Sequence, residues 1–385
     1  AAMARIFLFL VCVVSVFAQN ITLSPIILPA PPGPYVSKLS VHVLTDTSRP
    51  DPYNSSEPHR RLVVSVFDPV PKSQCSKTCE VQYMPPATAA HEDASIGLNV
   101  PLLEQFKLSG ICCNQYSNED TPLLIFSTGF GVSRLEYGAM AQYVSSYGYT
   151  IVTVDHTYDA DIVEFPDGQI ALGVFTGNTT DAEVAGALAV RTEDVLFVLD
   201  AVTKGAHGCS YSYKANKVGM YGHSLGGVTA SNAMLNDTQH RITGGINLDG
   251  GYLGPVLEDG LGSGKKSFLL FGSAVHNSSS DPSWEQFWET TDKLDPQDWR
   301  KEIHLKDSLH TTFSDFPLLA DVSGFRQIDP DLVNGELGTI NGVRAMQILT
   351  TYITAFFNMV LKGKKEPLLG GPSKEFPEVY FTRSG

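Results

Sequence analysis

The chain has 385 residues, of which 43% are hydrophobic and 18% are charged, and its formal net charge is −14. A chain of this length can bury a large core, and its charged fraction lies below the ~25% typical of soluble domains, which argues against an intrinsically disordered protein and against a coiled coil. The acidic balance argues against nucleic acid as a partner, because proteins that bind it concentrate positive charge on the contact surface. Beyond the N-terminus, no stretch reaches the ~18 consecutive apolar residues that a membrane-spanning helix needs.

The N-terminus has the pattern of a secretory signal peptide. Arg5 precedes the apolar run Ile6–Val14, and Val16-Phe17-Ala18 ends in the small residue that signal peptidase requires. We expect residues 1–18 to be removed, leaving a secreted, extracellular chain that starts at Gln19. A membrane anchor is the alternative, but the apolar run is short and no stop-transfer pattern follows it.

The cysteines and glycosylation motifs agree with an extracellular location. We expect disulfides between the pair Cys75/Cys79 and the pair Cys112/Cys113, with the connectivity left open, and Cys209 is the odd one. A zinc site at the first pair is disfavoured, because no second pair of ligands follows at finger spacing. N-x-[ST] motifs, which indicate a glycosylated surface, occur at Asn20, Asn54, Asn178, Asn236 and Asn277.

Apolar segments of strand length alternate with helical patterns after a proline-rich N-terminal arm, residues 19–35. Such an alternation predicts an α/β fold with a mostly parallel central sheet flanked by helices. We expect a single catalytic domain over residues 19–385, with the cysteine-bearing segment 75–113 as an insertion. The expected strands are 62–70, 123–127, 150–155, 218–222, 244–248 and 267–272, and the expected helices are 135–147, 181–202, 226–235 and 345–361.

Two further features each have two interpretations. Arg60-Arg61 is either a dibasic processing site or the charged start of the first strand, and we favour the strand, placed at the edge of the sheet. Trp284, Phe287 and Trp288 lie at helical spacing, so they either pack in the core or form a hydrophobic lip that associates with a lipid surface. Core packing is the simpler interpretation.

The most informative motif is Gly222-His223-Ser224-Leu225-Gly226, between a predicted strand and a predicted helix. This is the context of a G-x-S-x-G nucleophile elbow, in which two glycines permit a tight turn that presents a serine hydroxyl. Ser224 is therefore the candidate nucleophile. The competing interpretation is an ordinary strand-to-helix turn.

The partners of such a serine follow it along the chain as an acid and then a histidine. Asp249 ends the next strand and is the candidate acid, although a turn or helix-capping aspartate has the same appearance. Of the later histidines, His276 opens a Ser/Asn-rich loop and is expected in solvent, and His304 lies within a strand and is expected to be structural. His310 follows that strand after a short turn and is the candidate base.

Two backbone amides are the candidate oxyanion hole. Leu225 follows the nucleophile, and Phe130 lies in the glycine-containing loop Ser127–Gly131 after an early strand. The alternative for that loop is a plain glycine turn. This chemistry needs no metal and no organic cofactor.

With these residues in place, the chain resembles the plasma-type (isoform II) platelet-activating-factor acetylhydrolases, which are secreted, calcium-independent serine lipases of α/β-hydrolase fold. The resemblance implies Ser224 as nucleophile, Asp249 as acid and His310 as base, and a phospholipid with a short sn-2 acyl chain as substrate. Thr128 stands where the family usually has a histidine. The segments that carry the resemblance are Gly33–Tyr35, Arg61–Pro71, Phe126–Asp159, Gly222–Gly227, Leu248-Asp249 and Ser308–Phe316.

Three other functions compete with this one. A broad carboxylesterase or polyester hydrolase would use the same residues. A calcium-dependent secreted phospholipase would need a histidine beside paired cysteines, and Cys112-Cys113-Asn114-Gln115 has none. A catalytically dead hydrolase that serves as a binding protein would be expected to lack one residue of the triad, whereas here all three candidates are present. The sequence does not indicate the oligomeric state.

Overall fold

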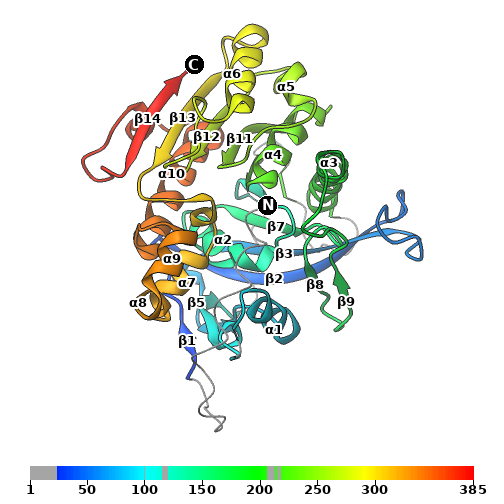
Figure 1. Ribbon diagram of the computed structural model, residues 1–385, viewed down its shortest axis with the longest axis vertical. Coiled ribbons are helices and arrows are strands. Elements are labelled where there is room, and N and C mark those ends of the chain that lie inside the picture. Colours follow the sequence, from blue (N-terminus) through cyan, green and yellow to red (C-terminus); the bar gives the residue numbers. More distant parts are fainter. Residues whose placement is uncertain (1–23, 99, 115–119, 206–212, 215–217) are drawn as a thin grey trace.

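The computed structural model describes residues 24–98, 100–114, 120–205, 213–214 and 218–385. The predicted signal peptide, the motif at Asn20 and the odd cysteine, Cys209, lie outside these residues. Figure 1 shows one central twisted sheet with helices on both of its faces. The predicted α/β class, a mostly parallel sheet flanked by helices, is confirmed.

Within the part of the chain that the structure describes, the main sheet has twelve strands, and its middle is a run of six parallel strands in the order β7-β6-β10-β11-β12-β13. Antiparallel strands β3 and β14 flank this run, and β2, β5 and β1 continue the sheet beyond β3, with β4 paired to β5. A separate hairpin is formed by β8 and β9. The bounds are β1 Ile26–Ile27, β2 Tyr35–Asp46, β3 Arg60–Pro71, β4 Thr78–Gln82, β5 Phe106–Cys112, β6 Leu123–Ser127, β7 Thr150–Asp155, β8 Ile162–Glu164, β9 Ile170–Leu172, β10 Val218–His223, β11 Ile242–Leu248, β12 Ser267–Gly272, β13 Trp299–Leu305 and β14 Val379–Ser384.

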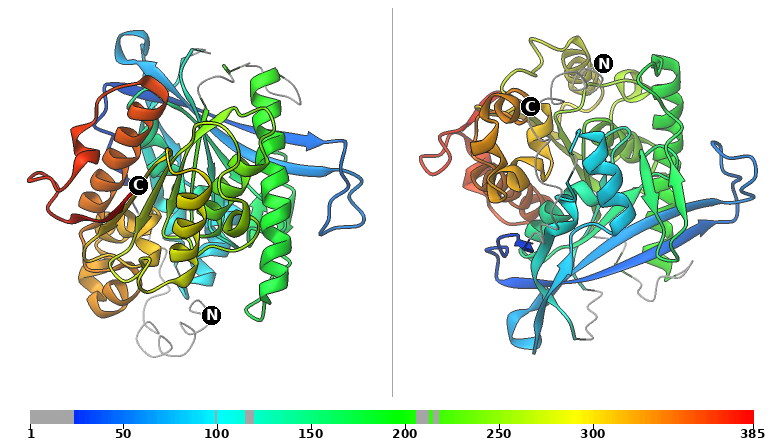
Figure 2. Two further views of the ribbon diagram at one scale, coloured as in Figure 1. Left: turned by 90° about the horizontal axis from the view of Figure 1, so that it is seen from above. Right: turned by 60° about the horizontal axis from the view of Figure 1, so that its bottom comes forward.

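Helices cover the two faces of the sheet and enclose a separate apolar core on each side. Figure 2 shows α10 and α3 on opposite faces. The core beneath α2 and α10 is rich in aromatic side chains, and the other core lies beneath α3, α4 and α6. The bounds are α1 Pro86–Ser95, α2 Gly138–Ser145, α3 Asp181–Lys204, α4 Leu225–Asn236, α5 Val256–Asp259, α6 Pro282–Leu294, α7 Phe316–Val322, α8 Phe325–Ile328, α9 Pro330–Leu337 and α10 Gly342–Lys362, with short 3₁₀ turns at Lys72–Gln74, Leu103–Gln105, Arg134–Tyr137, His310–Phe313 and Pro367–Gly370.

Local signals explain most helix ends. Helix α3 begins with a capping box in which the Thr180 hydroxyl accepts the Glu183 N–H and the Glu183 carboxylate accepts the Thr180 N–H, and it ends at Gly205, whose φ is 61°. The helix expected over 135–147 is instead a 3₁₀ turn followed by α2. The carboxylate of Asp315 accepts the N–H groups of Ala139 and Met140 and so fixes where α2 starts.

The expected position of the first long strand was wrong. Strand β3 lies inside the sheet, between β2 and β7, and not at an edge. The side chain of Arg60 at its start is fully buried and forms ion pairs with Asp51 and Asp194. Burial of this arginine favours the interpretation of Arg60-Arg61 as the start of a strand.

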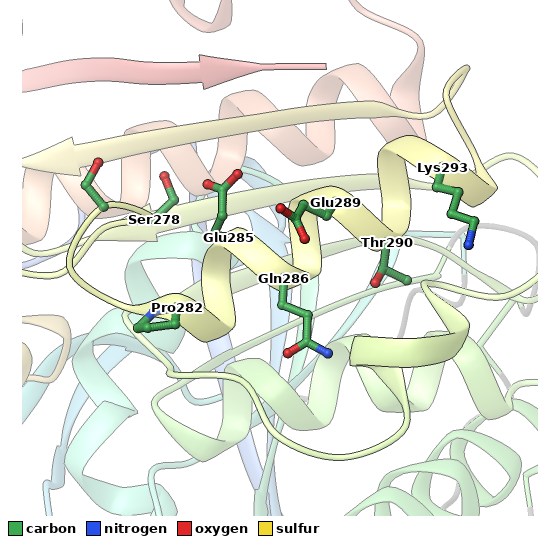
Figure 3. A pocket seen from close by; sticks show the side chains of 8 residues that line it. Ser278, Pro282, Glu285, Gln286, Glu289, Thr290 and Lys293 are labelled. Carbon is green, nitrogen blue, oxygen red and sulfur yellow. The ribbon is translucent and has the colours of Figure 1, made fainter.

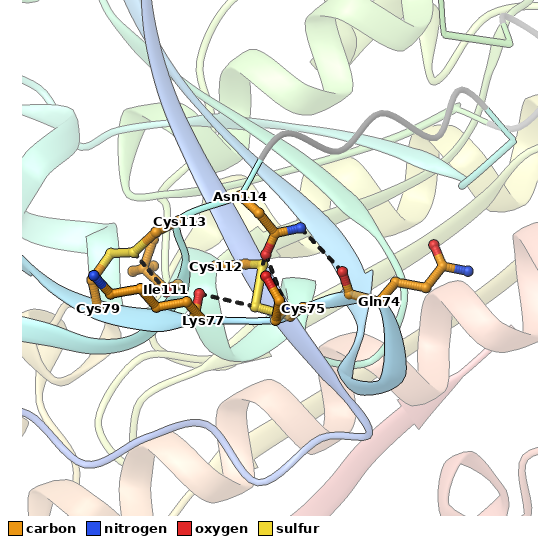
Figure 4. Close-up of a disulfide and its surroundings, with 9 residues drawn as sticks. Gln74, Cys75, Lys77, Cys79, Ile111, Cys112, Cys113 and Asn114 are labelled. Carbon is orange, nitrogen blue, oxygen red and sulfur yellow. Dashed lines mark hydrogen bonds between the residues drawn. A yellow bond between two sulfur atoms is a disulfide. The ribbon is translucent and has the colours of Figure 1, made fainter.

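Two disulfides tie the segment after β3 to β5 (Figure 4). Cys75 is bonded to Cys112, and Cys79 to Cys113, with Cα–Cα distances of 5.8 and 6.1 Å. The expected pairing between the two cysteine pairs is confirmed, and its connectivity is now defined. The arm reaches the same region, because β1 pairs in parallel with the start of β5.

The aromatic cluster of α6 belongs to the core. Trp284, Phe287 and Trp288 have no exposed surface, and the indole N–H of Trp288 donates to Glu302 at 2.9 Å. Core packing is therefore the correct interpretation, and these three side chains form no hydrophobic lip. Among the described residues, no helix combines the length and the apolar character needed to cross a membrane.

Candidate active site

The candidate nucleophile lies at a sharp turn between β10 and α4. Ser224 has φ 56° and ψ −126°, a backbone conformation that few non-glycine residues adopt. A Cβ at Gly222 would collide with the backbone of Gly226, and one at Gly226 would collide with the carbonyl of Ser127. The two glycines thus let the elbow pack directly against the end of β6.

Of the three residues predicted as a triad, His310 lies within hydrogen-bonding distance of both others. His310 Nε2 is 3.0 Å from Ser224 Oγ, and His310 Nδ1 is 2.7 Å from Asp249 Oδ2. The His310 side chain is 50% exposed, whereas that of Asp249 is 1% exposed. The site is therefore open to solvent on the side of the base and closed on the side of the acid.

Asp249 is held as a carboxylate where β11 ends. Burial opposes its ionisation, but hydrogen bonds from His276 and His310 and their charges outweigh burial, so the pKa of Asp249 lies well below its usual range. Oδ1 also accepts the N–H of Ser273 at 2.5 Å. These contacts leave Oδ2 directed at His310.

The expectation that His276 points into solvent was wrong. Its Nδ1 lies 3.2 Å from Asp249 Oδ1, its Nε2 lies 2.8 Å from Asp281 Oδ2, and its ring packs on Trp284 at 4.5 Å between centroids. Burial acts to lower the pKa of His276, but the two carboxylates raise it to about 9. The candidate acid is thus shared between two histidines, one of which carries a positive charge at neutral pH.

The third histidine downstream of Asp249 is enclosed in the core, as expected. His304 is fully buried, and its Nε2 lies 3.0 Å from Glu302 Oε1 and 2.9 Å from Thr382 Oγ1. Its hydrogen bonds are made away from Ser224.

His223, next to the nucleophile, was not singled out from the sequence. Its Nε2 donates to the carbonyl of His310 at 2.9 Å, and its Nδ1 accepts the hydroxyl of Tyr137 at 2.9 Å. Burial, followed by the charge of His310, lowers the pKa of His223 to about 3, so it stays neutral. This neutral ring links the elbow to the loop that carries the candidate base.

The two candidate oxyanion donors border the elbow. Leu225 is the first residue of α4, where a backbone N–H has no acceptor within the helix. Phe130 lies in the loop after β6, and its N–H has no hydrogen-bond acceptor among the described residues. Both amides are therefore available to an oxyanion.

Known proteins are similar in sequence to most of this chain. The family model described as platelet-activating factor acetylhydrolase, isoform II, matches residues 109–165 and 210–367. A probable 1-alkyl-2-acetylglycerophosphocholine esterase of Arthroderma benhamiae is 37% identical over 375 residues, which cover 93% of this chain and 94% of that protein. This chain belongs to the platelet-activating factor acetylhydrolase isoform II family. It is a hydrolase of the 1-alkyl-2-acetylglycerophosphocholine esterase type.

More distant relatives extend the comparison. The platelet-activating factor acetylhydrolase of Cavia porcellus is 28% identical over 225 residues, or 52% of this chain and 50% of that protein. Among solved structures, a ferulic acid esterase from Streptomyces cinnamoneus is similar, with a TM-score of 0.77 and 30% identity, covering 93% of this chain and 99% of that one. This family member therefore shares its fold with a ferulic acid esterase.

An open groove of about 720 Å³ lies along α6 (Figure 3). It is lined by Glu285, Gln286 and Glu289 and by the serines at 278 and 279. No triad residue lines it. Within the described ranges, no group of three or more histidine, cysteine, aspartate or glutamate side chains is arranged to hold a metal ion.

Proposed function

We propose that this protein is a secreted serine esterase that hydrolyses the short-chain (acetyl) sn-2 ester of platelet-activating factor and related phospholipids. The observation that carries the proposal is the continuous hydrogen-bond chain Ser224–His310–Asp249 beside two unoccupied amides. Membership of the acetylhydrolase family supports the ester class. The two disulfides support an oxidising, extracellular location.

The proposed reaction begins when His310 Nε2 removes the proton of Ser224 Oγ and the serine attacks the sn-2 carbonyl carbon. The N–H groups of Phe130 and Leu225 stabilise the oxyanion that forms. His310 then gives the proton to the leaving glycerol oxygen, and a water molecule releases the acyl group by the same steps in reverse. Asp249 keeps Nδ1 of His310 protonated, so that Nε2 faces the serine as a base.

The second candidate is a carboxylesterase of broader scope. The observation that favours it is the likeness to the ferulic acid esterase, which extends over nearly the whole of both chains. Such an enzyme would use the same serine, histidine and aspartate, and would differ only in the pocket around the acyl and leaving groups.

Parallel hydrolysis assays distinguish the two. Purified protein is given an sn-2 acetyl ether-phospholipid, methyl ferulate, and p-nitrophenyl esters from acetate to palmitate, all with excess chelator. Highest kcat/KM on the acetyl-phospholipid, lost in Ser224→Ala, is the expected result. Preference for methyl ferulate or for the simple esters would replace the acetylhydrolase proposal with the broader esterase. A folded protein that cleaves none of them would overturn both.

A further inference from the structure

A buried arginine holds the loop that carries the candidate oxyanion donor. Arg191 projects from α3, which lies between the two ranges that the family model matches. Its Nη1 donates to the carbonyl of Thr128 at 2.6 Å, and its Nη2 donates to the carbonyl of Gly129 at 2.8 Å. Its Nε donates to Asp159 Oδ2 at 2.8 Å, and Nη2 also contacts the other carboxylate oxygen. The side chains of both Arg191 and Asp159 are only 1% exposed.

We infer that Arg191 is a positioning residue that orients the oxyanion hole by fixing the peptide bond between Gly129 and Phe130. The inference rests on the proposed function, in which the N–H of Phe130 stabilises the oxyanion. It assigns a role in the reaction to a side chain that does not contact the substrate.

The geometry of the peptide bond explains how this works. In a trans peptide the C=O of one residue and the N–H of the next point in opposite directions. Because Arg191 holds the carbonyl of Gly129, the N–H of Phe130 must point away from α3. The adjacent elbow packs on the carbonyl of Ser127 at the start of the same loop. The free amide of Phe130 is thereby presented on the side of the loop that does not face the arginine.

The amides on either side of Phe130 are already engaged. The N–H of Gly129 donates to the hydroxyl of Tyr137 at 3.3 Å, and the N–H of Gly131 donates to Asp159 Oδ1 at 3.3 Å. Phe130 thus has the free N–H between two bonded ones, all within the described residues.

Arginine is suited to this task and lysine is not. The planar guanidinium offers donors in fixed directions, so one side chain can bond two carbonyls and a carboxylate at once. A lysine ammonium would keep the charge pair with Asp159 but would not hold both carbonyls in the same orientation. The Arg191→Lys substitution therefore keeps the buried ion pair with Asp159 but removes the hydrogen bonds that orient the peptide bond between Gly129 and Phe130.

A second buried arginine provides the matched control. Arg60 has no exposed side-chain surface and pairs with the buried carboxylates of Asp51 and Asp194, yet it forms no hydrogen bond to residues 128–131. Arg60→Lys should lower stability as Arg191→Lys does, because each change disturbs a fully buried ion pair. Only the variant at 191 should change the oxyanion hole.

The experiment measures kcat and KM for p-nitrophenyl acetate, affinity for a trifluoromethyl ketone, and thermal unfolding of both variants. The expected result for Arg191→Lys is a fall in kcat of about 10²-fold, as when an oxyanion donor is lost, with KM within about threefold. Ketone affinity should fall in parallel, because its adduct carries the oxyanion. Arg60→Lys should keep kcat within about threefold of wild type at a similar unfolding temperature.

Equal kcat in the two lysine variants would overturn the role of Arg191, while wild-type turnover would leave the proposed esterase function intact. Absence of turnover in folded wild-type protein would instead contradict the proposed function itself. If Arg191→Lys does not fold, Asp159→Asn takes its place, since it keeps the guanidinium but weakens its anchor. We expect that variant to lose about 10-fold in kcat with little change in KM, and wild-type kcat there would also overturn the inference.

Discussion

His276 should make the stability of this protein depend on pH in a defined direction. The substitution that tests this is His276→Gln, which keeps an amide able to bond Asp249 and Asp281 but removes the titrating charge. In the folded protein, the two carboxylates raise the pKa of His276 to about 9, against an ordinary value of 6.5. A histidine whose pKa is raised on folding stabilises the folded state fully below the unfolded pKa, and that stabilisation is lost as pH rises through the folded pKa.

The size of the effect follows from the shift. A difference of roughly 2.5 pH units at ~1.4 kcal/mol per unit gives an upper limit of about 3.5 kcal/mol. The His276 side chain is 18% exposed, so solvent screening reduces this figure, and we expect about 2 kcal/mol. The free energy of unfolding of wild type should therefore exceed that of His276→Gln by about 2 kcal/mol at pH 6. This difference should disappear as pH rises from 6.5 to 9.

The assay is urea unfolding of both proteins at pH 6, 7, 8, 9 and 10, with the free energy of unfolding extrapolated to water. His42→Gln is a control of opposite sign, because burial, followed by the charge of Lys38, lowers the pKa of His42. Because this effect sets in only below pH 6.5, this pair is also unfolded at pH 4 and 5, where the free energy of unfolding of wild type should fall relative to that of His42→Gln. A gap for His276→Gln that is the same at pH 6 and pH 10 would refute the reasoning.

Three further outcomes follow from the structure. Tyr137→Phe removes the hydroxyl that accepts the N–H of Gly129 and donates to His223. We expect kcat on p-nitrophenyl acetate to fall about 10-fold with KM little changed, and a wild-type kcat would contradict this. Trp288→Ala leaves a cavity beneath α6 and should cost about 3–5 kcal/mol in urea unfolding, whereas a loss below ~1 kcal/mol would be inconsistent with its burial. Reduction of the two disulfides should lower the thermal unfolding temperature but leave kcat within about twofold for the fraction that stays folded, and early loss of turnover would argue for a link to the site.

The strands and the elbow could be predicted because their signals are local. Continuous apolar segments identified the buried parallel strands to within one or two residues on most of their ends. The two glycines around Ser224 indicate a tight turn without any information about distant residues. His310 could be singled out as the candidate base from chain order together with its place just after a predicted strand and a short turn, because parallel strands place the loops that follow them at one edge of the sheet.

Features that depend on distant partners could not be predicted. The serine- and asparagine-rich loop after His276 predicted that the His276 side chain is exposed to solvent. Instead, Asp281, which caps α6, forms a hydrogen bond with the ring and holds it against Asp249. The start of α2 depends on Asp315, more than 170 residues away along the chain. Arg191 gave no signal, because nothing in a long helix indicates which loop a buried guanidinium will hold.

The most direct test of the central claim, catalysis by a Ser224–His310–Asp249 triad, is covalent labelling with a fluorophosphonate in the presence of a chelator. Mass spectrometry of the labelled, digested protein identifies the modified residue. We expect one phosphonyl group per chain, on Ser224, with a labelling rate that falls at least about 10³-fold in His310→Ala, because the serine depends on that base. Labelling at another residue, or a folded wild-type protein that takes up no label, would contradict the account.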